Sequence, residues 1–151
     1  MKNRNKETIV FTNGIFDILH IGHVELLKFA KNLGDKLIVG INSDRSTRLL
    51  KGNNRPIYTE HERKTILESI RYVDKVIIFD DADTINVIQE LRPDVVVKGG
   101  EWTADEVRKR DKIPEEIEVK VFPLILDHST TNILEKIKNI ETCDKSGTNN
   151  A

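Results

Sequence analysis

Short apolar runs alternate along the chain with longer segments in which apolar residues recur at helical spacing. Continuous apolar runs are typical of parallel strands buried on both faces. They predict strands at 8–14, 36–42, 75–79, 94–100 and 119–123. Helical spacing predicts helices at 21–34, 59–71, 84–92 and 129–140. This alternation predicts βαβ units, and hence an α/β fold with a doubly wound, five-stranded parallel sheet.

Local signals add detail at the ends of these elements. Thr59 with Glu62 three residues later is a capping-box pattern, Gly34 is expected to cap the helix before it, and Pro93 closes the helix at 84–92. The polar stretch "ETCDKSGTNNA" at 141–151 predicts a flexible tail. We therefore expect a single domain at 1–140 followed by that tail.

Composition narrows the class of protein. A chain of 151 residues is the size of one domain, and 24 basic against 25 acidic residues give a net charge of −1, which argues against a nucleic-acid binder. Cys143 is the sole cysteine, so no disulfide can form within the chain. The polar start "MKNRNKE" does not resemble a signal peptide, and no apolar run approaches the roughly 18 residues that span a membrane. We expect a cytoplasmic protein that has no membrane partner.

Three unusual stretches follow predicted strands. They are "TNGIFDILHIGH" after the first strand, "KGGEW" after the fourth and "DHSTTNI" after the fifth. Ligands of doubly wound sheets bind beyond the carboxyl ends of the strands. The three stretches are therefore expected to meet at one site.

His20 and His23 stand three residues apart around Gly22, where a strand gives way to a helix. Residues three apart share a helix face, and the free N–H groups of a helix N-terminus attract phosphates. Gly22 leaves room for a phosphate to approach the backbone. The pattern favours phosphoryl or nucleotidyl transfer, although a helix cap beside a core histidine would also explain it.

Competing signatures are missing from the sequence. It contains neither the G-x-x-x-x-G-K-[ST] P-loop nor the G-x-G-x-x-G dinucleotide turn. A zinc site at the two histidines lacks the H-E-x-x-H spacing and a third ligand, so we expect no metal held by the protein alone. A serine hydrolase would need a nucleophile elbow, which is missing too.

The stretch "GIFDILHIGH" at 14–23 resembles the G-x-F-D-x-x-H-x-G-H (HxGH) signature of the cytidylyltransferase-like nucleotidyltransferase superfamily, and the similarity covers about residues 8 to 138. The resemblance implies a Rossmann-like domain and an enzyme. His20 and His23 would stabilise the transition state at the α-phosphate of a nucleoside triphosphate. An acceptor phosphate would attack, pyrophosphate would leave, and Mg²⁺ would accompany the triphosphate. Members of the superfamily are commonly homodimers.

A second stretch, "STTNI", resembles the family motif that holds the β- and γ-phosphates. A Ser-Thr-Thr run that opens a helix supplies hydroxyl and backbone donors, although simple N-capping would also explain it. Lys51, in a Lys-Gly-x-x-Arg-Pro loop, is expected to close over the triphosphate as a third catalytic residue. The predicted nucleotide-binding residues are Asn13, Gly14, Ile15, Phe16, Gly22, Lys98, Gly99, Trp102, Ser129, Thr130 and Thr131.

Three of these, Lys98, Gly99 and Trp102, lie at the end of the fourth strand or just after it. Lys98 ends a buried strand, where a cation needs an anionic ligand or an acidic partner. Gly99 and Gly100 would let a nucleobase lie against the backbone. Trp102 would stack on the base or simply cover the core.

The stretches at 42–57, 97–102 and 127–133 together look most like bacterial D-glycero-β-D-manno-heptose 1-phosphate adenylyltransferases. This similarity implies ATP and a heptose 1-phosphate as substrates, giving an NDP-heptose. Glycerol-3-phosphate cytidylyltransferases are the near alternative. They carry an arginine shortly before the Ser-Thr-Thr run, where this chain has "PLILDH".

The expected acceptor-binding residues are Asp17, Arg63, Arg71, Glu101 and His128. A turn-forming role for the aspartate and surface ion pairs for the arginines are the alternatives. No fused kinase domain is expected, so a separate enzyme would supply the sugar 1-phosphate. A nucleotide-binding sensor without turnover is the alternative from another class, and the retained histidines argue against it.

Overall fold

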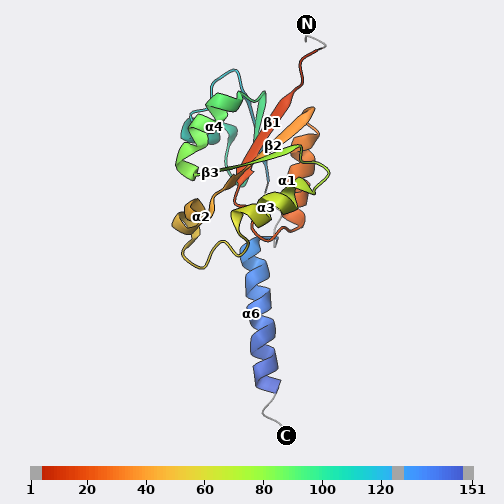
Figure 1. Cartoon of the computed structure of the whole chain (residues 1–151), viewed down its shortest axis with the longest axis vertical. Helices are drawn as coiled ribbons and strands as arrows, with labels where there is room; N and C mark the ends of the chain where they lie inside the picture. The colour runs from red at the N-terminus through yellow and green to blue at the C-terminus, as the bar shows by residue number, and fades with distance from the viewer. Residues whose placement is uncertain (1–4, 124–127, 148–151) are drawn as a thin grey trace.

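The computed structural model describes residues 5–123 and 128–147. Five parallel strands form one sheet in the order β3-β2-β1-β4-β5, which confirms the predicted fold class (Figure 1). The strands are β1 (Ile9–Gly14), β2 (Lys36–Asn42), β3 (Lys75–Phe79), β4 (Val95–Gly99) and β5 (Glu118–Phe122). The winding direction reverses between β1 and β4, where a doubly wound sheet has its ligand crevice.

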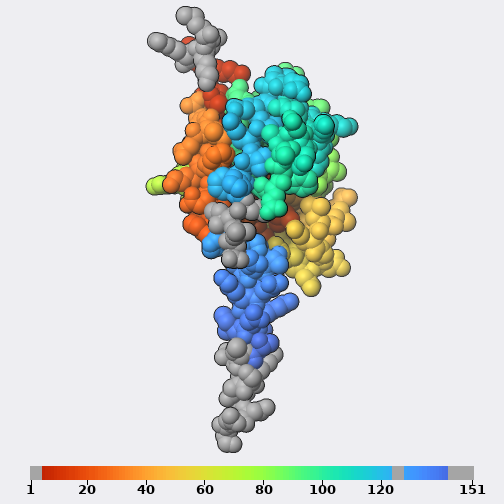
Figure 2. All heavy atoms as spheres, turned by 180° about the vertical axis from the view of Figure 1, so that it is seen from behind, coloured from red at the N-terminus to blue at the C-terminus, as the bar shows by residue number. Residues whose placement is uncertain are grey.

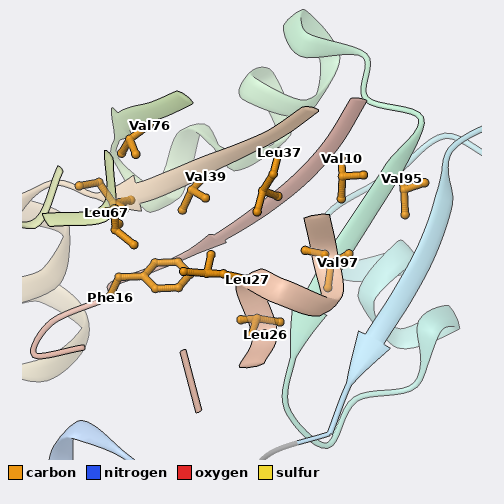
Figure 3. Close-up of a cluster of buried hydrophobic side chains, with 12 residues drawn as sticks. Val10, Phe16, Leu26, Leu27, Leu37, Val39, Leu67, Val76, Val95 and Val97 are labelled. Atoms are coloured by element: carbon orange, nitrogen blue, oxygen red, sulfur yellow. The ribbon is translucent and has the colours of Figure 1, made fainter. Parts of the chain in front are cut away.

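Helices cover both faces of the sheet. Residues of α1 (Ile21–Lys31) and α3 (Glu60–Glu68) pack on one face, and residues of α4 (Thr84–Leu91) and α5 (Ala104–Arg110) pack on the other. Successive strand residues point to opposite faces, so Val10 belongs to the first core cluster and Phe11 to the second. Figure 3 shows the first cluster.

Two short helices are not predicted by the apolar spacing of the sequence. Helix α2 (Asp44–Lys51) begins at Ser43, whose hydroxyl accepts a hydrogen bond from Ser46 N–H at 3.0 Å. Helix α5 begins at Thr103, which forms a capping box with Glu106. Capping boxes are visible in sequence, so this second helix could have been found.

The predicted helix ends were less accurate than the starts. The capping box of Thr59 is confirmed, but α3 ends at Glu68 instead of residue 71. Helix α1 ends at Lys31, so Gly34 is not its cap. A Cβ at Gly34 would lie 2.7 Å from the Thr8 carbonyl oxygen, so close chain packing explains this glycine.

Helix α6 (Thr130–Gly147) projects away from the sheet (Figures 1 and 2). It continues seven residues past the predicted end, so the first part of the expected tail is helical; no proline or glycine interrupts this segment before Gly147. Residues 148–151 lie outside the described residues, and the division into domain and tail stays a prediction. Within the described segments, no helix is both long and apolar enough to cross a membrane.

Candidate active site

A cleft of about 300 Å³ lies where the carboxyl ends of the strands meet the N-termini of α1 and α6. Three predicted stretches contribute to it, as expected from the winding of the sheet. The lining residues are Ile15, Phe16, Asp17, His20, Gly22, His23, Leu26, Lys51, Arg55, Gly99, Phe122, Pro123, His128, Ser129, Thr130 and Thr131.

The two histidines form the N-terminal cap of α1. Gly22 N–H donates to Nδ1 of His20 at 3.0 Å, and His20 N–H donates to Nδ1 of His23 at 3.4 Å. The two rings stack with their centroids 3.8 Å apart. A ring nitrogen that accepts a hydrogen bond carries no proton, so the neutral rings hold theirs on Nε2. Each ring thus keeps one N–H donor for a ligand in the cleft.

The protein environment favours these neutral rings. Burial lowers the pKa of His20, and His128 lowers it further. Burial lowers the pKa of His23 to about 3, with His20 adding to the effect and Asp17 opposing it. At neutral pH the pair therefore provides directed hydrogen-bond donors without net charge.

The position of the His20 ring requires a glycine at residue 22. A Cβ at this residue would lie 2.8 Å from Cε1 of His20 and 3.3 Å from the carbonyl oxygen of His128. Any larger residue would push the ring out of place. The glycine predicted for phosphate access is thus needed for the ring itself.

The loop between β1 and α1 has an unusual backbone. Phe16 and Ile18 have φ values of 52° and 42°, in a region that non-glycine residues seldom occupy. The Phe16 ring is buried next to Leu27 in the first core cluster (Figure 3), and it lies 5.2 Å from the His23 ring. A Cβ at Gly14 would come within 3.1 Å of the Phe16 ring. Phe16 therefore anchors the loop in the core. It also lines the cleft, and its predicted contact with the nucleotide stays a prediction.

The start of α6 adds hydroxyl groups, but two of them are already engaged. The Ser129 hydroxyl accepts a hydrogen bond from Asn132 N–H at 3.1 Å, and Thr130 donates to the Asp17 carbonyl oxygen at 2.6 Å. Thr130 thus ties α6 to the loop between β1 and α1, residues 15–20, which we call the histidine loop. Its predicted role as a phosphate ligand stays a prediction. Thr131 and His128 are exposed and line the cleft as expected.

The Asp17 side chain is fully buried and organises the loop after α2. Its carboxylate accepts hydrogen bonds from Arg55 Nε at 3.1 Å, from Ile57 N–H at 2.7 Å and from Tyr58 N–H at 3.0 Å. The Asp17 carboxylate therefore has an anchoring role, and its predicted contact with the acceptor stays a prediction. The anchored segment, residues 51–58, brings Lys51 and Arg55 to the cleft, and we call it the cationic loop.

Arg63 is fully buried beneath this site. Its guanidinium donates to the carbonyl oxygens of Ile15 and Asn42, both at 2.8 Å, and pairs with Asp44 at 2.9 Å. Arg63 thus connects the histidine loop to α2. The structure does not bring it to the cleft lining, where its predicted contact with the acceptor would lie. Burial of an arginine could not be read from its helical spacing.

Arg71 lies near the amino-terminal ends of the strands, whereas the cleft lies at their carboxyl ends. It follows α3 and stacks on Tyr72, just before Asp74, which accepts a hydrogen bond from Leu37 N–H at the beginning of β2. The structure therefore does not bring Arg71 to the cleft within this chain. Helix α3 runs antiparallel to the strands, so its first residues lie near the carboxyl ends of the strands and its last residues near their amino-terminal ends.

Lys98 has found an acidic partner, one of the two alternatives for a buried cation. It lies 3.1 Å from Asp111 and donates to the Asn13 side chain. Burial lowers the pKa of Lys98, and Asp111 opposes this shift. Lys98 is turned toward Asp111 at the end of α5, and neither Lys98 nor Asn13 lines the cleft. Their predicted contacts with the nucleotide stay predictions.

Glu101 and Trp102 also lie outside the cleft lining, although neighbouring Gly99 belongs to it. Trp102 is 47% exposed, and the guanidinium of Arg110 lies 4.7 Å from its ring centroid. The tryptophan does not cover the core. Its predicted stacking on a base, like the predicted role of Glu101, stays a prediction.

The described side chains offer no ready-made metal centre. No group of three or more His, Cys, Asp or Glu among them is placed to hold an ion. Asp17 is the only carboxylate among the described lining residues, and three donors already occupy it.

Comparison with known proteins agrees with this geometry. A family model described as Cytidylyltransferase-like matches residues 11–144. The "Bifunctional protein HldE" of Campylobacter fetus is 46% identical over 90% of this chain, and that of Koribacter versatilis is 48% identical over 88%. This chain spans only 29% and 28% of those two relatives.

Solved structures extend the comparison. The chain is similar to a lipopolysaccharide core biosynthesis protein from Thermoplasma volcanium, with a TM-score of 0.67 and 31% identity over 80% of this chain and 98% of the other. A pantoate-beta-alanine ligase from Francisella tularensis, 20% identical with a TM-score of 0.54 over 79% of this chain and 60% of the other, shares the fold. Together with the family match over residues 11–144, these similarities show that the chain belongs to the cytidylyltransferase-like family.

Proposed function

We propose that the protein transfers a nucleoside monophosphate from a nucleoside triphosphate to a sugar 1-phosphate and releases pyrophosphate. The observation that carries the proposal is the stacked pair of neutral histidines at the N-terminus of α1, which line the cleft and whose Nε2–H donors bond no other residue that the structure describes. Such donors suit a reaction in which negative charge grows on phosphate oxygens.

The proposed step needs no nucleophile from the enzyme. An oxygen of the acceptor phosphate attacks the α-phosphorus of the triphosphate, and the bond from that phosphorus to the bridging oxygen of the leaving pyrophosphate breaks. His20 and His23 donate hydrogen bonds to the oxygens whose charge increases. The N-terminus of α6, with exposed Thr131, offers backbone and hydroxyl donors for the other phosphates.

The proposed acceptor is D-glycero-D-manno-heptose 1-phosphate and the proposed donor is ATP, giving an NDP-heptose. The resemblance of the loops at 42–57 and 97–102 to heptose 1-phosphate adenylyltransferases supports this choice. Similarity to a lipopolysaccharide core biosynthesis protein supports a sugar acceptor as well. The loop before the Ser-Thr-Thr run, which argued against glycerol 3-phosphate, includes residues 124–127, which lie outside the described residues.

Three further features belong to the proposal. Mg²⁺ would enter with the triphosphate and take phosphate oxygens as ligands, because Asp17 is occupied and no metal cluster is present among the described side chains. A cytoplasmic location fits the use of nucleoside triphosphates. A homodimer is proposed from the family resemblance alone.

A panel assay tests the proposal. Pyrophosphate release is measured with ATP, CTP, GTP and UTP, each paired with heptose 1-phosphate or glycerol 3-phosphate. We expect the highest kcat/KM for ATP with heptose 1-phosphate. Higher efficiency with CTP and glycerol 3-phosphate would favour the alternative acceptor, and tight nucleotide binding without turnover of any pair would indicate a sensor.

A further inference from the structure

The cleft has few sources of permanent positive charge. Among the described lining residues, Lys51 and Arg55 are the only lysine and arginine, and the stacked pair His20 and His23 is neutral at pH 7. A triphosphate and a phosphate monoester each bring strong negative charge, about −1.5 to −2 for the monoester alone. The acceptor phosphate therefore needs a cationic partner that the histidine pair does not supply.

Arg55 is held in a way that suits this task. Its side chain is only 14% exposed, and its Nε donates to the fully buried carboxylate of Asp17 at 3.1 Å. No acceptor among the described residues is bonded to its Nη1 or Nη2. The guanidinium is thus fixed at one edge and keeps a fork of N–H donors at a cleft-lining position.

The surroundings of Asp17 make this arrangement rigid. The same carboxylate accepts hydrogen bonds from the backbone N–H groups of Ile57 and Tyr58. The backbone carbonyl oxygen of Asp17 accepts one from the Thr130 hydroxyl. The cationic loop, the histidine loop and α6 therefore meet at one buried residue. An arginine fixed through such a residue loses little side-chain entropy when it binds an anion.

We propose that Arg55 binds the phosphate group of the acceptor, and that Asp17 is the positioning residue that aims it. This inference rests on the proposed function and deepens it by naming the subsite for the acceptor phosphate. Arg63 and Arg71 are the arginines expected there from sequence. Arg63 is buried against the histidine loop, and Arg71 lies near the amino-terminal ends of the strands. The N-termini of α1 and α6 and the Lys51 ammonium are available to bind the triphosphate, so Arg55 is the cation left for the acceptor.

Equilibrium binding tests the proposal without relying on turnover. Heptose 1-phosphate and, separately, Mg²⁺ with α,β-methylene-ATP are titrated by calorimetry into the wild type and into Arg55→Gln. We expect the Kd for the sugar phosphate to rise by at least about tenfold, because a charge-assisted, forked contact is lost. The Kd for the nucleotide analogue should change less than about threefold, a difference worth under about 0.7 kcal/mol.

Three more variants sharpen the result. Arg55→Lys keeps the charge but not the fork, and should weaken sugar-phosphate binding by an intermediate factor. Asp17→Asn keeps the shape of the anchor and should weaken the same Kd while Arg55 is present. Arg48→Gln is the matched control, because Arg48 is exposed on α2 and does not line the cleft. It should change neither Kd, and thermal melting checks that every variant is folded.

The outcomes separate this inference from the proposed function. Unchanged binding of heptose 1-phosphate to Arg55→Gln, equal weakening of the nucleotide analogue, or no binding of the sugar phosphate to the wild type would each overturn the role of Arg55. Turnover by the wild type together with unchanged binding by Arg55→Gln would overturn this role and leave the transferase intact. Selective loss of sugar-phosphate binding without turnover in the panel assay would support the subsite and contradict the transferase.

Discussion

Two parts of the cleft lining offer different chemical groups to the proposed phosphate ligands. The N-terminal turn of α1 offers His20 and His23, whose rings are tied to the backbone and carry no charge at neutral pH. The cationic loop offers Lys51 and Arg55, whose charge is permanent. Permanent cations attract any phosphate, bound or reacting, whereas preorganised neutral donors matter most where charge grows during the reaction. We infer that the histidines act mainly on the rate and the cationic loop mainly on affinity.

The largest expected effect comes from His20→Asn. Asparagine is a good N-cap, so it can still accept the Gly22 N–H, but it lacks the Nε2–H donor. Loss of one preorganised donor typically lowers the rate by about 10²–10³-fold. Steady-state kinetics should show this loss in kcat with melting unchanged. If the variant keeps more than about a third of the activity, capping alone explains this histidine.

Gly22→Ala should have the next largest effect, since the added Cβ would displace the His20 ring. Misplacing a catalytic group by about 1 Å can lower the rate roughly 10²-fold. The control is Lys28→Ala, at an exposed position of the same helix that does not line the cleft. We expect kcat to fall for Gly22→Ala and to stay near the wild-type value for Lys28→Ala. Equal kcat values for the two variants would contradict the close fit around His20.

The pH dependence of stability tests the neutral state of the histidine pair. Burial lowers the pKa of His23 to about 3 in the folded protein, while an unfolded chain has a pKa near 6.5. Below pH 6.5 the unfolded state binds the extra proton, so the free energy of unfolding should fall as the pH falls toward 3. The contribution is at most about 1.4 kcal/mol per pH unit. Urea unfolding at pH 7 and pH 5 should show a smaller pH effect in His23→Asn, and an identical effect would argue against a depressed pKa.

The smallest effect is expected from a chain that ends at Ile140. Both parts of the cleft lining lie far from the end of α6, and residues 141 and 142 are exposed. Turnover and melting temperature should stay close to those of the full chain. A large drop in either would show that the end of α6 packs against the body or a neighbouring subunit.

Sequence patterns predicted the sheet and the centre of the site well. Apolar runs mark strands because parallel strands are buried on both faces, and His20, Gly22 and His23 are close neighbours whose geometry follows from one helix turn. Which way a side chain at a known position points was harder to predict. Lys98 ends a strand as expected, but it turns to Asp111 on the far face. Such choices depend on partners distant in sequence.

Arg55 is a second residue whose role depends on a partner that is distant in sequence. It stands in the Lys-Gly-x-x-Arg-Pro stretch, whose sequence alone predicts a role for Lys51 but not for Arg55. Its importance follows from Asp17, which lies 38 residues away and anchors the loop. From the sequence, Asp17 is expected to contact a substrate, whereas in the structure three donors occupy its carboxylate.

The most direct test of this division compares affinity and rate in the same variants. Binding of Mg²⁺ with α,β-methylene-ATP and the single-turnover rate at saturating substrates are measured for His23→Asn and for Lys51→Gln. We predict that His23→Asn binds within about threefold of the wild type and reacts about 10²-fold more slowly or worse, whereas Lys51→Gln binds at least about tenfold more weakly and reacts at nearly the wild-type rate. A His23→Asn variant that loses affinity in proportion to its rate would contradict the account.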